Sequence, residues 1–149
     1  MRPVTKQLVV EAPQERAFRV FTENFDAWWP REHHIGAAAL KAAVLEPKKG
    51  GRWYEICEDG SECQWGKVLE WDPPRRLLLA WQLNGEWKYD PELITEIEVT
   101  FTPEGPKRTR VDFEHRYIER MGALAEATRK SLDGGWGGIL DLYRRVAEG

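Results

Sequence analysis

Two side chains in the sequence could carry acid–base chemistry inside a cavity. His115 lies in a segment of alternating polar and apolar residues, in step with Val111 and Phe113, so the alternation places it on the inward face of a strand. Glu55 is in step with Trp53 on another strand-like segment, although the alternation alone does not say which face of that strand points inward. An inward histidine is either a hydrogen-bonded core residue or a polar group able to bind a ligand or act as a base. If Glu55 also faces inward, the two residues form an acid–base pair.

The two cysteines are the other candidates for chemistry. Cys57 and Cys63 lie on either side of Asp59-Gly60, a dipeptide typical of two-residue hairpin turns. Such a turn pairs Cys57 with Glu62 and directs the side chain of Cys63 to the opposite face of the hairpin. Two cysteines are also too few for a disulfide framework, and a zinc site needs additional ligands. We therefore expect two reduced thiols and no metal site.

His33 and His34 are adjacent in the chain. Neighbouring residues of a strand or helix point in different directions, so the two imidazoles are not expected to bind one metal ion together. They form either a solvated loop pair or the lip of a cavity. Motifs for phosphate binding, for a nucleophilic serine and for calcium or zinc binding do not occur in the sequence. We expect no cofactor.

Tryptophan gives the strongest signal, with eight residues in a chain of 149. Trp53, Trp65 and Trp81 fall on three successive predicted strands, while Trp29 ends a helical segment and Trp136 belongs to the last helix. This distribution favours an aromatic cavity whose walls come from a sheet and whose cover is helical; the alternative is a dense aromatic core plus surface tryptophans. The candidate ligand-binding residues are Trp29, Trp53, Glu55, Trp65, Trp81, Thr95, His115 and Trp136.

Composition and charge narrow the range of partners. The formal net charge is −3 and 42% of the residues are hydrophobic, so the chain has an ordinary globular balance and no excess of basic residues to follow a phosphate backbone. We expect no nucleic-acid partner. The N-terminal residues 1–6 lack the apolar run of a signal peptide, and the sequence has no apolar stretch long enough to span a bilayer. The expectation is a cytoplasmic protein without membrane insertion, either a monomer or a homodimer.

Hydrophobic periodicity and turn residues define the order of elements. The sequence predicts a strand, two short helices, a run of strands joined by tight turns, and a long C-terminal helix. Sequential strands with hairpin turns form an antiparallel sheet, and the last helix must cover its apolar face. We predict a single α+β domain over residues 1–149, with a curved sheet of about six or seven strands. The predicted strands are 4–11, 42–45, 52–58, 63–71, 76–83, 93–102 and 109–117, and the predicted helices follow Pro13 and cover 24–29 and 119–147.

Four glycines surround Trp136 in the predicted last helix: Gly134, Gly135, Gly137 and Gly138. Each glycine inside a helix costs roughly 1 kcal/mol relative to alanine, so their presence needs an explanation. One explanation is that the backbone there approaches the sheet or a ligand more closely than a side chain permits. The other is a break, with one helix ending near Asp133 and another beginning at Trp136.

A set of short motifs is distributed over nearly the whole chain. They are 10–22, Asp-Ala-Trp-Trp-Pro (26–30), Gly-Gly-Arg-Trp-Tyr-Glu (50–55), Asp-Gly (59–60), 65–77, Ala-Trp (80–81), 95–103, 109–115, Gly-Trp (135–136) and Ile-Leu (139–140). Together they resemble the Hsp90-ATPase-activator-homologue-like group of the START-like superfamily, which is also called the polyketide cyclase and Bet v 1-like superfamily. The resemblance implies a helix-grip fold, an internal cavity and binding of a small apolar or amphipathic molecule. It implies no particular reaction, because the shared motifs are mainly structural.

Three functions are compatible with these observations. The first is binding of a small hydrophobic or aromatic molecule without catalysis. The second is a cofactor-free enzyme of the cyclase or hydratase kind, with His115 or Glu55 as the acid–base group in the cavity. The third is a protein-interaction or co-chaperone-like module that engages a partner through exposed tryptophans such as Trp71 and Trp87.

Overall fold

The computed structural model describes all residues, 1–149, and its central feature is one seven-stranded antiparallel sheet. The strand order is β1-β7-β6-β5-β4-β3-β2, so β2 to β7 form a meander and β1 adds to the edge beside β7. The helix-grip prediction of an α+β fold is confirmed. The strands are β1 (Val4–Val10), β2 (Leu40–Leu45), β3 (Arg52–Cys57), β4 (Glu62–Asp72), β5 (Arg76–Trp81), β6 (Thr95–Gly105) and β7 (Arg108–Arg116).

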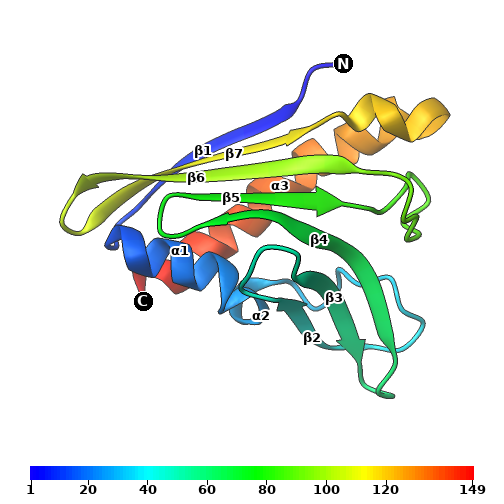
Figure 1. Cartoon of the computed structure of the whole chain (residues 1–149), viewed down its shortest axis with the longest axis horizontal. Coiled ribbons are helices and arrows are strands. Elements are labelled where there is room, and N and C mark those ends of the chain that lie inside the picture. Colours follow the sequence, from blue (N-terminus) through cyan, green and yellow to red (C-terminus); the bar gives the residue numbers. More distant parts are fainter.

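Helices cover one face of this sheet (Figure 1). α1 (Gln14–Thr22) and α2 (Phe25–Trp28) follow β1, as the pattern of apolar residues predicts. The long α3 (Ala125–Glu148) crosses behind the strands in Figure 1, preceded by a short 3-10 helix, η1 (Ile118–Leu124). β4 bends strongly, so β3 and β2 curl away from the plane of β5, β6 and β7. No helix is long and apolar enough to cross a membrane.

The inward position predicted for His115 is confirmed, and β6 alternates in the same way as β7. On β6, Thr95, Ile97 and Phe101 are buried beneath the helices, and on β7 Phe113 and His115 are buried on the same face. The opposite face carries a charged ladder in which Arg116 contacts the carboxylates of Glu96, Glu98 and Glu114.

The prediction of a break in the last helix is wrong. α3 is helical without interruption from Ala125 to Glu148, and Trp136 packs on Phe113 of β7 with ring centroids 4.7 Å apart. The prediction that the glycine backbone closely approaches the sheet is also wrong. A Cβ added at Gly134, Gly135, Gly137 or Gly138 would meet nothing within 4 Å. A close approach to a ligand stays a prediction.

The predicted turn of the β3–β4 hairpin is wrong by one residue. The Cys57 N–H donates to the Ser61 carbonyl at 2.8 Å, so the loop has three residues, and Glu55 lies opposite Cys63. The cause is local: the Asp59 carboxylate accepts hydrogen bonds from the N–H and hydroxyl of Ser61. Gly60 adopts a left-handed conformation at φ 86°, as three-residue hairpin loops require. The new register places both cysteines on the same face as Glu55.

Candidate functional site

An aromatic pocket opens between the sheet and α3, at the end of the sheet where β4 and β5 meet the loop after α2. Its volume is about 270 Å³, and nine of its 14 lining residues are hydrophobic. Trp65 and Trp81 come from neighbouring strands, Trp136 and Ile139 come from α3, and Trp29 follows α2. The rings are in edge and tilted contact: Trp29 lies 5.2 Å from Trp65 and 6.0 Å from Trp136, centroid to centroid. Each of these tryptophans is at most 6% exposed, so the pocket wall is built from the parts of the rings that the other rings leave uncovered.

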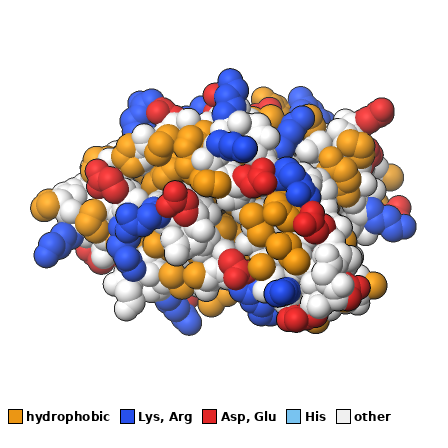
Figure 2. Space-filling view, turned by 60° about the horizontal axis from the view of Figure 1, so that its bottom comes forward, with side chains coloured by type: hydrophobic (Ala, Val, Ile, Leu, Met, Phe, Trp, Pro, Cys, Tyr) orange, Lys and Arg blue, Asp and Glu red, His pale blue; other side chains and the backbone are white.

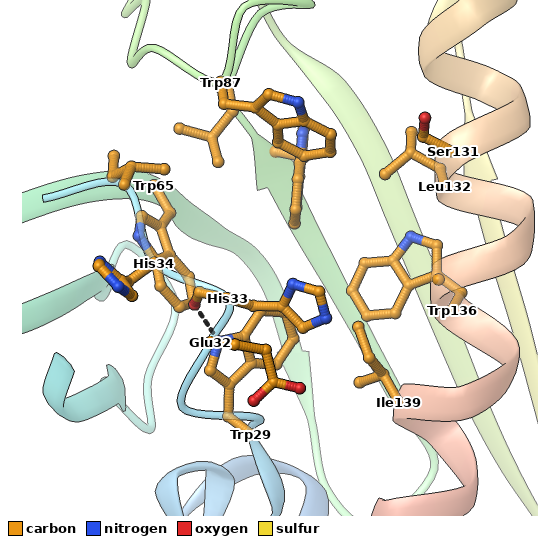
Figure 3. A pocket seen from close by; sticks show the side chains of 14 residues that line it. Trp29, Glu32, His33, His34, Trp65, Trp87, Ser131, Leu132, Trp136 and Ile139 are labelled. Atoms are coloured by element: carbon orange, nitrogen blue, oxygen red, sulfur yellow. Dashed lines mark hydrogen bonds between the residues drawn. The ribbon is translucent and has the colours of Figure 1, made fainter. Parts of the chain in front are cut away.

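Polar groups gather at the mouth of this pocket. Figure 3 shows the imidazole of His33 projecting into the space between Trp29 and Trp136, with the carboxylate of Glu32 close by. The Trp29 indole N–H donates to the His33 carbonyl at 2.8 Å, which fixes this segment against the pocket wall. The ring of His33 makes no hydrogen bond within the chain, whereas His34 pairs its Nδ1 with the Gly36 carbonyl. The two imidazoles point apart, and both line the pocket, as the cavity-lip alternative predicts.

His115, the leading acid–base candidate, lies behind the pocket wall. It is fully buried, and both ring nitrogens are used. An indole N–H can only donate, so the 3.3 Å contact from Trp136 makes Nδ1 an acceptor and leaves the proton on Nε2. Nε2 then donates to the Thr95 hydroxyl at 2.8 Å, and Thr95 donates to the Trp81 carbonyl. Burial lowers the pKa of His115 to about 3, so the ring is neutral and its role is to hold Trp136 and Trp81 in place.

Glu55 also lies outside the pocket lining. Its carboxylate is fully buried and accepts hydrogen bonds from the backbone N–H groups of Ile35 and Gly36 and from the indole of Trp65. Ile35 is itself a pocket residue. Glu55 therefore anchors the loop that carries one wall of the pocket, and its oxygens are occupied.

The structure thus divides the eight residues predicted from sequence into two groups. Trp29, Trp65, Trp81 and Trp136 line one pocket. Trp53, Glu55, Thr95 and His115 are buried behind it and do not line it. The Nε1–H groups of Trp53 and Trp81 are buried without a hydrogen-bond partner.

Sequence reasoning missed part of the lining. Trp87 is 43% exposed at the pocket and lies 6.4 Å from Trp81, centroid to centroid. It adopts a left-handed conformation with φ 60°, which is strained for an aromatic residue. Ser131 and Gly135 of α3 complete the rim, and helical periodicity with Trp136 could have identified its neighbours Leu132 and Ile139 in the lining.

Comparison with known proteins assigns the family. The chain belongs to the Activator of Hsp90 ATPase homolog 1-like proteins, whose family model matches residues 11–147. It is 40% identical to the anthrahydroquino-gamma-pyrone synthase Txn09, over 98% of this chain and 97% of that chain, with a TM-score of 0.70. It is 37% identical to CalC, a self-sacrificing resistance protein from Micromonospora echinospora, over 98% and 94% of the two chains, with a TM-score of 0.74. CalU16 from the same organism, at 20% identity over 99% of this chain and 75% of its own, shares the fold with a TM-score of 0.65. No curated protein sequence matches the chain.

Proposed function

We propose that this protein binds a small, planar aromatic molecule in the pocket between β4, β5 and α3. The observation that carries the proposal is the lining itself, in which Trp29, Trp65, Trp81 and Trp136 surround one cavity of about 270 Å³. This volume is near the lower end of the roughly 300–1,000 Å³ typical of small-molecule sites, so it suits a ligand of a few fused rings.

Burial of apolar surface supplies the main favourable contribution to binding. Burial of about 200 Å² of apolar ligand surface at roughly 25 cal/mol per Å² supplies near 5 kcal/mol before ordering costs. Stacking on several indoles adds roughly 1 kcal/mol for each well-placed aromatic pair. The similarity to Txn09 supports the same ligand class, because the name of that protein specifies an anthrahydroquinone fused to a pyrone.

A fluorescence titration with 1,8-dihydroxyanthraquinone tests the binding proposal. We expect saturable quenching of tryptophan emission with a dissociation constant of about 1–10 µM, equivalent to roughly −7 to −8 kcal/mol. The variant Ser131→Trp should block the pocket without disturbing the core, because Ser131 is exposed at the rim. The matched control is Lys130→Trp on the exposed face of the same helix, which adds the same ring outside the lining and should bind as the wild type does. Equal binding by both variants, or no saturation, would refute the proposal.

A second candidate function is cyclisation of such a ligand. Two observations favour it: the similarity to a pyrone synthase over nearly the whole chain, and the imidazole of His33 beside Glu32 in the pocket. His33 replaces the buried His115 and Glu55 as the acid–base group of this alternative. In a substrate with a phenol ortho to a 1,3-diketone chain, His33 would accept the phenolic proton while the oxygen attacks the distal carbonyl carbon. The new C–O bond gives a hemiketal, which then loses its hydroxyl group, protonated by His33, together with a proton of the carbon between the two carbonyls; one water molecule leaves and a γ-pyrone results.

Turnover of an ortho-hydroxyaryl 1,3-diketone tests this alternative. Mass spectrometry would follow the loss of one water molecule from the substrate. We expect His33→Ala to abolish the enzyme-dependent rate while the dissociation constant changes little, because a base acts in the reaction more than in binding. The control His34→Ala should retain the rate. A wild-type rate equal to that in buffer would leave binding as the function.

The protein-interaction alternative has less support. On the face shown in Figure 2, hydrophobic side chains lie in separate groups with charged residues between them. Trp71, one of the two tryptophans proposed as exposed contacts, is half-buried against Phe18, with ring centroids 5.1 Å apart.

A further inference from the structure

Three potential metal ligands converge where the β3–β4 hairpin meets the loop after α2. They are the carboxylate of Glu55 and the thiols of Cys57 and Cys63, whose ligand atoms all lie within 4.8 Å of one another. Glu55 and Cys57 are fully buried, and Cys63 is partly exposed. The one-residue change in the hairpin register brings Cys63 to this face.

The backbone of Gly36 packs directly against all three ligand atoms. A Cβ added at Gly36 would lie 2.5 Å from the sulfur of Cys57, 3.1 Å from Oε2 of Glu55 and 3.3 Å from the sulfur of Cys63. A side chain at position 36 would therefore clash with the sulfur of Cys57 and crowd the other two ligand atoms. The Gly36 N–H instead donates to Oε2 of Glu55, which orients the carboxylate.

The charge of Glu55 gives a second, independent indication. Its hydrogen bonds come from uncharged groups only: two backbone N–H groups, the indole of Trp65 and the thiol of Cys57. A buried carboxylate is costly without a positive partner, and buried charges are normally paired or coordinate a metal ion. A cation between Glu55 and the two sulfurs would supply that partner.

We propose that Glu55, Cys57 and Cys63 form a binding site for a transition-metal dication of the zinc type. Two thiolates and one carboxylate select zinc over magnesium or calcium, which prefer oxygen ligands only. Ligands at about 2.3 Å (sulfur) and 2.0 Å (oxygen) in a tetrahedron lie roughly 3.5 Å apart. The sulfur of Cys57 and Oε2 of Glu55 are 3.5 Å apart.

Coordination requires no oxidation or reduction. Each thiol releases its proton to solvent and binds as a thiolate, and Oε2 of Glu55 exchanges the Cys57 S–H for the metal ion. The fourth position takes a water molecule from the partly exposed side of Cys63. Two thiolates and a carboxylate exceed the charge of the ion by one, so the occupied site carries the same net charge as the Glu55 carboxylate beside two neutral thiols, and the N–H donors directed at Glu55 serve both states.

Titration of reduced, metal-free protein with Co²⁺ tests the proposal. We expect one ion per chain, with a thiolate-to-cobalt charge-transfer band and the intense ligand-field bands of tetrahedral Co²⁺, all removed by added Zn²⁺. Cys57→Ser and Cys63→Ser should each weaken binding by more than the roughly 100-fold that loss of a ligand-orienting partner costs. The control His33→Ala alters the surface imidazole at the pocket and should leave the spectrum unchanged.

A measurement on the unaltered chain covers the case in which a serine variant does not fold. Zn²⁺ should protect the partly exposed thiol of Cys63 in the wild type from alkylation by iodoacetamide, whereas the buried Cys57 is shielded in either state. The proposal is overturned by absence of the charge-transfer band in the wild type, by a band of equal intensity in folded Cys63→Ser at the same Co²⁺ concentration, or by equal alkylation of Cys63 with and without Zn²⁺. Each result is independent of whether the aromatic pocket binds a ligand, because the cluster lies outside the pocket lining.

Discussion

The indole N–H of Trp136 on α3 donates to Nδ1 of His115 on β7 across 3.3 Å. This bond joins the helix that covers the sheet to the strand beneath it at the wall of the aromatic pocket. Because His115 must remain neutral to accept it, the geometry of the wall depends on the protonation of one buried residue.

Acid should destabilise the protein through His115. The folded-state pKa of about 3 lies below the ordinary value of 6.5, because burial penalises the imidazolium, and the hydrogen-bond partners of the ring are uncharged. The unfolded chain therefore binds more protons between these values, so the stabilisation is complete above about pH 6.5 and is lost as the pH falls toward 3. We expect the titration of His115 to lower the free energy of unfolding by about 1.4 kcal/mol for each unit that the pH falls between roughly 6 and 4.

Urea denaturation of the wild type and His115→Gln at pH 7 and pH 5 measures this effect. Glutamine can accept from Trp136 and donate to Thr95 but does not titrate. The wild type should lose more of its free energy of unfolding between pH 7 and pH 5 than His115→Gln does, so the difference in this free energy between the two proteins should be smaller at pH 5. An unchanged difference would mean that His115 does not titrate on unfolding in this range.

Gly135 and Gly138 of α3 allow the effect of an alanine on helix stability to be separated from its effect on ligand binding. Gly138→Ala should raise the free energy of unfolding by about 1 kcal/mol, because the position is helical and the added methyl group meets nothing. Gly135→Ala should give a similar gain but weaken binding of 1,8-dihydroxyanthraquinone, because Gly135 lines the pocket. Thermal denaturation and the fluorescence titration measure the two effects. Equal affinities for both variants would show that the ligand does not approach Gly135.

Glu55→Gln should loosen the loop that forms one pocket wall. The amide keeps the shape of the side chain but replaces one acceptor oxygen with a donor, so the N–H of Ile35 or Gly36 loses its partner. Leaving a buried donor unsatisfied costs about 1–3 kcal/mol. Hydrogen exchange at these two amides should accelerate, whereas Glu58→Gln at an exposed position should change neither stability nor exchange. Protection equal to that of the wild type would contradict the anchoring role.

Trp87 should carry measurable backbone strain. Its φ of 60° favours glycine over any residue with a Cβ. Because Trp87→Gly and Trp87→Ala both remove the ring, their difference isolates the backbone. Trp87→Gly should be more stable than Trp87→Ala by about 1 kcal/mol in chemical denaturation. An alanine variant of equal or greater stability would indicate that the loop relaxes when the ring is removed.

The alternation of polar and apolar residues and the turn residues predicted the sheet, because both signals lie within a short stretch of the sequence. They correctly placed Thr95 and His115 on the inward face, but an inward residue can lie behind the pocket as well as in it. Whether an inward residue lines the pocket depends on which rings of α3 and of the loop after α2 cover the strand. The pattern of a single strand does not predict this, because these contacts join segments that are distant in the sequence.

The turn between β3 and β4 is a second case in which the sequence pattern did not determine the side-chain contacts. Asp59-Gly60 correctly indicated a hairpin, but the hydrogen bonds from Ser61 to Asp59 set a three-residue loop and reversed the face of Cys63. One side-chain interaction thus decides whether the two thiols meet at Glu55.

The contacts among the indoles also have an optical consequence. Trp29, Trp65, Trp53, Trp81 and Trp136 form a continuous chain in which successive ring centroids are 5.2 to 5.8 Å apart. At such separations, electronic excitation transfers between indoles, and their transition dipoles couple. The near-ultraviolet circular dichroism should therefore report the arrangement of the set as a whole. A quencher in contact with Trp29 should reduce emission that originates from Trp53, although Trp53 does not line the pocket.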